Sequence, residues 1–170
     1  LAMTEAGNLV LQREPTDLAE LAADVAASFQ PQAQRLGIQL AQITQPSPDR
    51  SHEAEAPYVV NVDPVRIREV ITNLVSNALR YTPNGGKVTI YVESPAADNA
   101  AQSVHIRVQD TGRGIAPELL AHVFDRFTKS RDSMGSGLGL AIAKQLVEAH
   151  GGRIYAHSQV DIGTTVAFEI

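Results

Sequence analysis

The helical stretch "ITNLVSNALRY" carries polar side chains at a spacing that could do chemistry. On an ideal helix of about 100° per residue, Asn73, Asn77, Arg80 and Tyr81 fall on one side, and the opposite side is apolar. Asparagine is a poor residue for a helix interior, because its amide competes with the backbone for hydrogen bonds. An amide oxygen is a suitable ligand for Mg²⁺, and an arginine on the next turn can bind a phosphate. The stripe therefore favours a nucleotide site, with a solvated helix face as the alternative.

A carboxylate and two glycines follow an expected strand in "QDTGRG". Asp110 at the strand end could accept a hydrogen bond from the exocyclic amine of adenine, and Gly112 and Gly114 would let the backbone approach the base closely. The simpler alternative is that Asp110 only caps the turn. The D-x-G-x-G pattern alone leaves both possibilities open.

A second glycine segment, "GSGLGL", places Gly135, Gly137 and Gly139 at the start of an expected helix. Free N–H groups and a partial positive charge at such a start can bind phosphate oxygens, and a flexible loop is the alternative. The segment lacks the G-K-S/T of a Walker A loop. Its spacing also differs from G-x-G-x-x-G, and no strand leads directly into it.

Hydrophobic periodicity and capping residues predict the elements that position these groups. Asp17 is an expected N-cap and Gly37 an expected stop for the first helix, and Asp63-Pro64 is a typical start for the asparagine helix. The expected helices cover residues 18–35, 65–81, 117–122 (short) and about 140–150, and the expected strands cover 10–17, 38–43, 58–62, 87–93, 103–110, 153–158 and 164–169. The pattern predicts a two-layer α/β sandwich, with a mixed sheet of about five strands on three main helices, and a hairpin formed by strands 87–93 and 103–110.

Composition excludes several classes of function. The 170 residues suit one domain, and no apolar run reaches the length that a membrane-spanning helix needs. The absence of cysteine excludes disulfides and thiolate metal sites and suits a reducing cytoplasm. With a net charge of −5 and no cluster of Lys and Arg, the chain lacks the basic surface that nucleic-acid-binding proteins have.

Taken in order, four segments resemble the motifs of the ATP-binding catalytic domain of bacterial two-component sensor histidine kinases. "NLVSNALRYT" is similar to the family's asparagine box, "DTGRG" to its first glycine box, "FDRF" to its phenylalanine box and "GSGLGL" to its second glycine box. The resemblance covers about residues 12–170. It implies the Bergerat ATP-binding fold, an α/β sandwich with a lid loop over the nucleotide, shared with DNA gyrase, MutL and ninety-kilodalton heat-shock chaperones.

The resemblance also implies roles for individual residues. Asn77 would coordinate Mg²⁺, with Asn73 lining the same metal and phosphate site, and Asp110 would accept from the adenine amine. Phe124 and Phe127 would anchor the lid against the body. The remaining implied nucleotide-binding residues are Arg80, Tyr81, Gly112, Gly114, Ile115, Phe127, Lys129, Gly135, Gly137, Leu138, Gly139 and Leu140.

The residue at position 73 bears on the reaction. Members of the superfamily that hydrolyse ATP generally have a glutamate there, and a carboxylate can polarise water whereas the amide of Asn73 cannot act as a base. Asn73 therefore favours phosphoryl transfer to a neutral imidazole nitrogen, catalysed by Asn73, Asn77 and Arg80, with Glu69 one turn earlier as a helper. An anti-sigma-type protein-serine kinase and an ATPase of the same superfamily remain the alternatives.

The expected organisation is a piece of a larger protein. Residues 1–11 resemble the tail of a preceding dimerisation and phosphoacceptor helix, and residues 12–170 the kinase domain. The expected cofactors are ATP and Mg²⁺. The expected partners are the parent's own dimerisation domain and a response regulator, without nucleic acid. We expect a monomeric domain in the cytoplasm, within a homodimeric parent anchored in the inner membrane.

Overall fold

The computed structural model describes residues 10–45, 58–94, 103–127 and 137–170. Within these ranges the elements follow one another as β1 (Glu14–Asp17), α1 (Leu18–Leu36), β2 (Gln39–Gln45), β3 (Val59–Val62), α2 (Pro64–Tyr81), β4 (Lys87–Glu93), β5 (His105–Asp110), α3 (Pro117–Leu120), α4 (Gly139–Ala149), β6 (Arg153–Gln159) and β7 (Gly163–Glu169). The expected elements are all present, with ends that differ by a few residues. Among the described helices, none combines the length and apolar content that crossing a bilayer requires.

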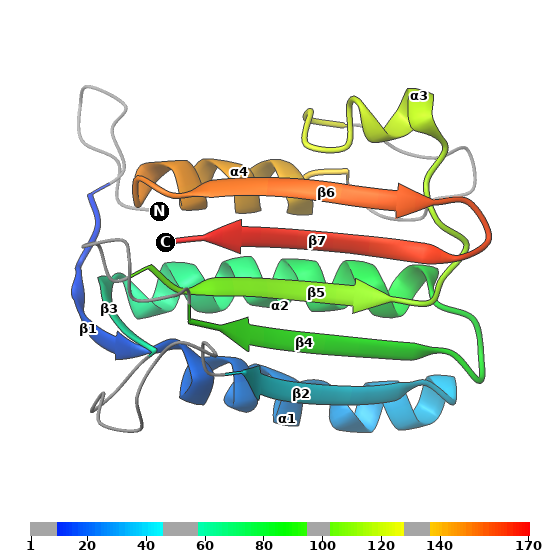
Figure 1. The fold of residues 1–170 in the computed structure, drawn as a ribbon, viewed down its shortest axis with the longest axis horizontal. Helices are drawn as coiled ribbons and strands as arrows, with labels where there is room; N and C mark the ends of the chain where they lie inside the picture. Colours follow the sequence, from blue (N-terminus) through cyan, green and yellow to red (C-terminus); the bar gives the residue numbers. More distant parts are fainter. Residues whose placement is uncertain (1–9, 46–57, 95–102, 128–136) are drawn as a thin grey trace.

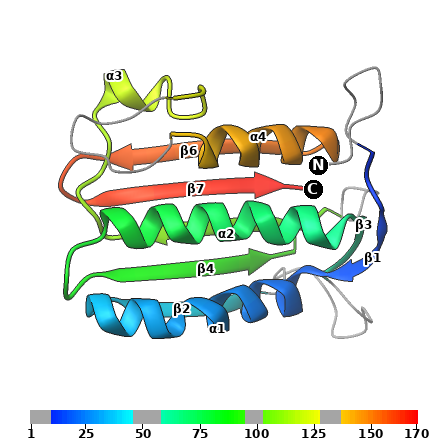
Figure 2. The ribbon, with the colours of Figure 1, turned by 180° about the vertical axis from the view of Figure 1, so that it is seen from behind.

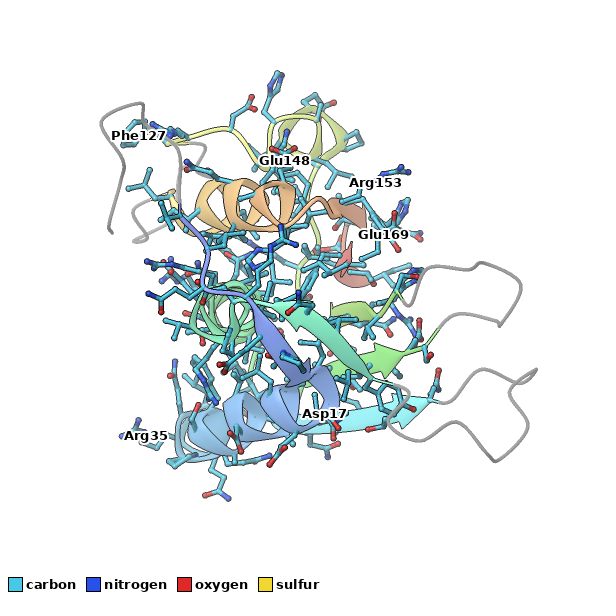
Figure 3. The ribbon with its side chains drawn as sticks, turned by 90° about the vertical axis from the view of Figure 1, so that its left-hand side faces the viewer. Asp17, Arg35, Phe127, Glu148, Arg153 and Glu169 are labelled. Atoms are coloured by element: carbon cyan, nitrogen blue, oxygen red, sulfur yellow. The ribbon has the colours of Figure 1, made fainter. Side chains whose placement is uncertain are left out.

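Five strands form one mixed sheet in the order β2-β4-β5-β7-β6. Strands β2 and β4 are parallel, and the other neighbours are antiparallel, including the predicted β4–β5 hairpin. Helices α1, α2 and α4 cover one face of the sheet, as Figures 1 and 2 show from the two sides. In the edge-on view of Figure 3, Arg153 and Glu169 lie on the opposite, open face. The predicted two-layer α/β sandwich is confirmed.

Strands β1 and β3 pair with each other in a separate antiparallel ribbon. Sequence periodicity predicted both strands but not their partnership. The ribbon lies beside the start of α1 and α2 (Figure 1). It brings the backbone N–H of Gln12 to 2.9 Å from Oδ2 of Asp63, the N-cap residue of α2.

Helix α2 lies at the centre of the core. Its N-cap Asp63 accepts hydrogen bonds from the N–H groups of Val65 and Arg66, as the Asp-Pro signal predicted. The face that packs on the sheet and on the flanking helices is almost fully buried, and comprises Ile67, Val70, Ile71, Leu74, Val75, Ala78 and Leu79. Burial of this many aliphatic side chains holds the helix in place, so its polar face need not contribute to stability.

Candidate nucleotide site

A cavity of about 360 Å³ opens beside the polar face of α2. Most of its walls come from α2, from the end of β5 with the segment that follows it through α3, and from the start of α4, and Thr164 adds a part of β7. Sixteen residues line it, namely Asn73, Ser76, Asn77, Arg80, Tyr81, Asp110, Arg113, Gly114, Ile115, Ala116, Leu119, Val123, Gly137, Gly139, Leu140 and Thr164. Its volume is in the range of small-molecule sites, about 300–1,000 Å³.

The polar stripe predicted on α2 forms one wall of this cavity. Asn73, Asn77, Arg80 and Tyr81 all line it, while the opposite face of the helix is buried in the core. The asparagine amides therefore lie in a cavity, a setting that can use their oxygen atoms as ligands. The expected helper Glu69 lies outside this lining and pairs with Arg66 instead, with Arg66 Nη1 3.3 Å from Glu69 Oε2.

Asp110 is buried, 8 % exposed, at the end of β5. Its Oδ1 accepts hydrogen bonds from the backbone N–H of Gly112 at 2.8 Å and of Thr164 at 3.2 Å. Among the described residues, no donor is bonded to Oδ2. Burial raises the pKa of the Asp110 carboxyl, against the two backbone hydrogen bonds, which lower it. The carboxylate is therefore held in place by one oxygen, and the other is available to a ligand.

The loop after Asp110 is fixed by close backbone approaches. Gly114 has φ +68°, and a Cβ there would collide with the carbonyl oxygen of Gln159 in β6. The N–H of Asp161 donates to the carbonyl of Arg113 at 2.8 Å. The guanidinium carbon of Arg113 lies 4.9 Å from the centre of the Tyr81 ring, within cation–π range. The β6–β7 hairpin thus holds the loop after Asp110 in place through backbone contacts.

The start of α4 completes the cavity. Gly137, Gly139 and Leu140 line it, and a Cβ added to Gly139 would lie 3.4 Å from Oδ1 of Asn73. The first turn of this 11-residue helix is therefore adjacent to the asparagine wall. The N–H groups at the start of a helix carry a partial positive charge, which suits an anion placed between α4 and the asparagine wall of α2.

Some predicted site residues lie elsewhere. Gly112 and Leu138 flank the cavity without lining it, and Lys129 and Gly135 lie outside the described residues. Phe127 is 70 % exposed, and Figure 3 shows it at the periphery, which differs from the expected packing against the body. Its backbone has φ +65° and its N–H donates to the carbonyl of Gly137, so the chain is held here through the backbone. Phe124 is the aromatic residue of this segment that packs on the core.

Sequence reasoning missed six lining residues: Ser76, Arg113, Ala116, Leu119, Val123 and Thr164. Ser76 was detectable, because it follows Asn73 by three positions on the helix, and Arg113 lies within the D-x-G-x-G segment itself. Thr164 had no local signal. It reaches the site because β7 pairs with β5 and places Thr164 opposite Asp110.

Residues 62–170 match the family model described as histidine kinase-, DNA gyrase B-, and HSP90-like ATPase. The sensor protein kinase PmrB of Pseudomonas aeruginosa is 40 % identical over 157 residues, which are 91 % of this chain and 30 % of PmrB. The sensor histidine kinase WalK of Bacillus subtilis is 41 % identical over 116 residues, 65 % of this chain and 18 % of WalK. The chain thus spans less than a third of the length of either relative.

Two solved structures share the fold. Full-length ShkA in complex with AMPPNP superposes with a TM-score of 0.78 at 30 % identity, over 95 % of this chain and 31 % of that one. The nucleotide-free catalytic domain of histidine kinase ThkA superposes with a TM-score of 0.74 at 28 % identity, over 94 % and 95 % of the two chains. The chain therefore belongs to the histidine kinase-, DNA gyrase B- and HSP90-like ATPase family, as a histidine kinase-type ATPase domain.

Proposed function

We propose that this domain binds Mg-ATP in the cavity beside α2 and transfers the γ-phosphoryl group to a histidine of its parent's dimerisation domain. The observation that carries the proposal is the meeting of three chemically different walls in one cavity: a buried carboxylate, two amides with an arginine, and a helix N-terminus. The ShkA structure with AMPPNP, an ATP analogue, supports a nucleotide as the ligand.

The nucleobase would bind at the Asp110 end of the cavity. Its exocyclic amine would donate to Oδ2 of Asp110, the oxygen with no described donor. Ile115, Leu119 and Val123 supply apolar lining to the cavity, and Tyr81 supplies an aromatic ring. A flat, weakly polar ring with one amine edge fits such a wall.

The phosphates would lie between α2 and the start of α4. Arg80, an exposed cation at the cavity wall, can pair with phosphate oxygens, and the free N–H groups of α4 can donate to them. Phosphoryl transfer needs positioning and charge neutralisation more than covalent chemistry, and these groups provide both.

The residues present fit a magnesium ion. Mg²⁺ binds one or two protein oxygens together with phosphate oxygens and water, so it needs few ligands from the chain. The amide oxygen of Asn77 can be one of them, with Asn73 beside it on the same wall. The described residues contain no cluster of three or more His, Cys, Asp or Glu side chains that could hold a metal without the nucleotide. When bound, the ion would neutralise phosphate charge.

In the transfer step, a neutral imidazole nitrogen of the acceptor histidine forms the new P–N bond, and the bond from the γ-phosphorus to the β,γ-bridging oxygen breaks. ADP leaves with the electron pair of that bond, and the imidazole proton passes to solvent. Asn73 supports transfer over hydrolysis, because an amide cannot deprotonate water. The superfamily ATPase and the protein-serine kinase are the competing functions.

A phosphotransfer assay tests the proposal. The purified chain is mixed with Mg²⁺, γ-labelled ATP and a separate dimerisation domain, with an Asn77→Ala chain as the matched control. Acid-labile, base-stable label on the dimerisation domain is expected with the unaltered chain only. Steady release of inorganic phosphate without such label would favour the ATPase, and acid-stable label on a partner would favour the serine kinase.

We further propose that the parent protein is an inner-membrane homodimer that passes the phosphoryl group to a response regulator, and that residues 1–11 end its phosphoacceptor helix. The ThkA kinase has been solved in complex with the response regulator TrrA, which supports such a partner. Residues 1–9 lie outside the described residues, and Val10 and Leu11 belong to no helix.

A further inference from the structure

The hydroxyl group of Ser158, near the end of β6, joins three parts of the chain. Its Oγ accepts a hydrogen bond from the backbone N–H of Ile115 at 2.8 Å, donates to the carbonyl oxygen of Gly163 at 3.0 Å and lies 2.8 Å from Oγ1 of Thr164. Ser158 itself does not line the cavity, whereas Ile115 and Thr164 do. Any effect of Ser158 on a ligand must therefore act through these neighbours.

The three contacts fix the direction of the hydroxyl protons. Each hydroxyl has one proton and two lone pairs. A carbonyl oxygen can only accept, so the proton of Ser158 must point to Gly163 for that bond to exist. Ser158 then has only lone pairs for its other two contacts, and the proton of Thr164 must point to Ser158. Satisfying all three bonds thus leaves the Thr164 hydroxyl with lone pairs, and no proton, for the cavity.

This acceptor lies beside a second one. Thr164 and Asp110 are paired across β7 and β5, and the Thr164 N–H donates to Oδ1 of Asp110 at 3.2 Å. Both residues are buried, each 8 % exposed, and both line the cavity. A ligand edge with N–H donors fits two neighbouring acceptors, whereas a carbonyl oxygen at the same place would face lone pairs.

We propose that Ser158 is a positioning residue for nucleobase selection: by holding the Thr164 proton, it makes the wall an acceptor and favours a base with an amine edge over one with a carbonyl edge. The inference rests on the proposed function, with the base of ATP beside Asp110. ATP and GTP are the discriminating pair, because guanine has a carbonyl where adenine has its exocyclic amine. In the Ser158→Ala chain the Thr164 proton is free to turn toward the cavity and donate to that carbonyl.

A purely structural Ser158 would behave differently. It would tie the loop at Ile115 to the hairpin, and its loss would weaken binding of both nucleotides by a similar factor. The ratio of the ATP and GTP dissociation constants separates the two roles.

The experiment measures both dissociation constants by calorimetry, with displacement titration for the weaker nucleotide. The variants are Ser158→Ala, Thr164→Val, which keeps the branched shape and the backbone N–H, their double variant, and Thr164→Ser, which keeps the hydroxyl. Ser28→Ala is the matched control, because that serine bonds to the Val25 carbonyl on α1. We expect each of the first two variants to reduce the preference for ATP by about 3- to 10-fold, the effect of one neutral hydrogen bond. The double variant should lose no more than Thr164→Val, because Ser158 acts through Thr164.

Several results would overturn the proposal: an unchanged ratio in Ser158→Ala, equal weakening of both nucleotides, or a further loss of preference in the double variant. If Ser158→Ala does not fold, Thr164→Val and Thr164→Ser provide the test. Equal preference for ATP in these two variants would show that the Thr164 hydroxyl does not select the base, and would reject the proposal. Binding of neither nucleotide by the unaltered chain would reject the proposed function itself, together with this inference.

Discussion

Replacing Asp110 by asparagine isolates the oxygen that is proposed to recognise the base. Two backbone N–H groups donate to Oδ1, so the amide oxygen of an asparagine must take the Oδ1 position. Its NH₂ group then replaces Oδ2, and a donor faces the amine of adenine where an acceptor stood. The change is confined to one atom of the side chain, and the bonds from Gly112 and Thr164 remain.

The magnitude follows from the lost hydrogen bond. A hydrogen bond to a charged group contributes about 1.5–3 kcal/mol. Each 1.4 kcal/mol corresponds to a factor of ten, so the dissociation constant for ATP should rise by about 10- to 150-fold. Burial disfavours the charged form of the Asp110 carboxyl and so raises its pKa. A neutral asparagine lacks that cost, so the free energy of unfolding should fall by less than about 1 kcal/mol.

Calorimetry at neutral pH gives the affinity, and thermal unfolding of the nucleotide-free chain gives the stability. Asp161→Asn is the matched control, because it removes the same charge from an exposed residue on the β6–β7 hairpin. Its left-handed backbone, φ +63°, is one that asparagine tolerates. An unchanged ATP affinity in Asp110→Asn would exclude Asp110 from base recognition. Equal losses of stability and affinity would show that Asp110 only supports the fold.

Three further outcomes are expected. Asn77→Ala should abolish Mg²⁺-dependent phosphotransfer while ATP binding without Mg²⁺ changes little, as measured by the label assay and by calorimetry. Gly114→Ala should weaken ATP binding and lower the unfolding temperature more than Gly151→Ala, because both glycines have positive φ but only at Gly114 does an added Cβ collide with backbone. The chain should lose stability on acidification below about pH 6.5, the ordinary pKa of histidine, because His150 is buried and accepts the N–H of Asp63 at 3.0 Å. Burial lowers the pKa of His150, so the unfolded chain binds the proton first and stability rises with pH through this window.

Different results would contradict each expectation. Retained phosphotransfer in Asn77→Ala would reject the metal role of the amide. Equal effects of the two glycine substitutions would mean that the loop can move away from the hairpin. A His150→Gln chain that keeps the full dependence of unfolding temperature on pH between about 5 and 7 would assign that dependence to other groups.

Local sequence signals predicted the elements well because their causes are local. The Asp63 cap and the proline after it start α2, and apolar residues at helical spacing define its buried face. Helical spacing alone also predicts that Asn73, Asn77 and Arg80 lie on one side of α2. The ribbon of β1 and β3 was not predicted as a pair, because 41 residues separate Asp17 from its partner Val59 by numbering and no turn signal joins them.

The sequence by itself thus determined which faces are polar, where helices begin and which segments carry glycine, since these depend on side-chain chemistry and on neighbours a few residues away. Only the tertiary structure decided what those faces meet. Thr164 stands beside Asp110 because β7 pairs with β5, and Ser158 reaches Ile115 because the β6–β7 hairpin packs behind the loop. Phe127 is exposed, although the family resemblance implied that it anchors the lid. Pairings between distant strands and contacts between loops are set by the lowest free energy of the whole chain, whereas local spacing predicts only near-neighbour pairs such as the β4–β5 hairpin.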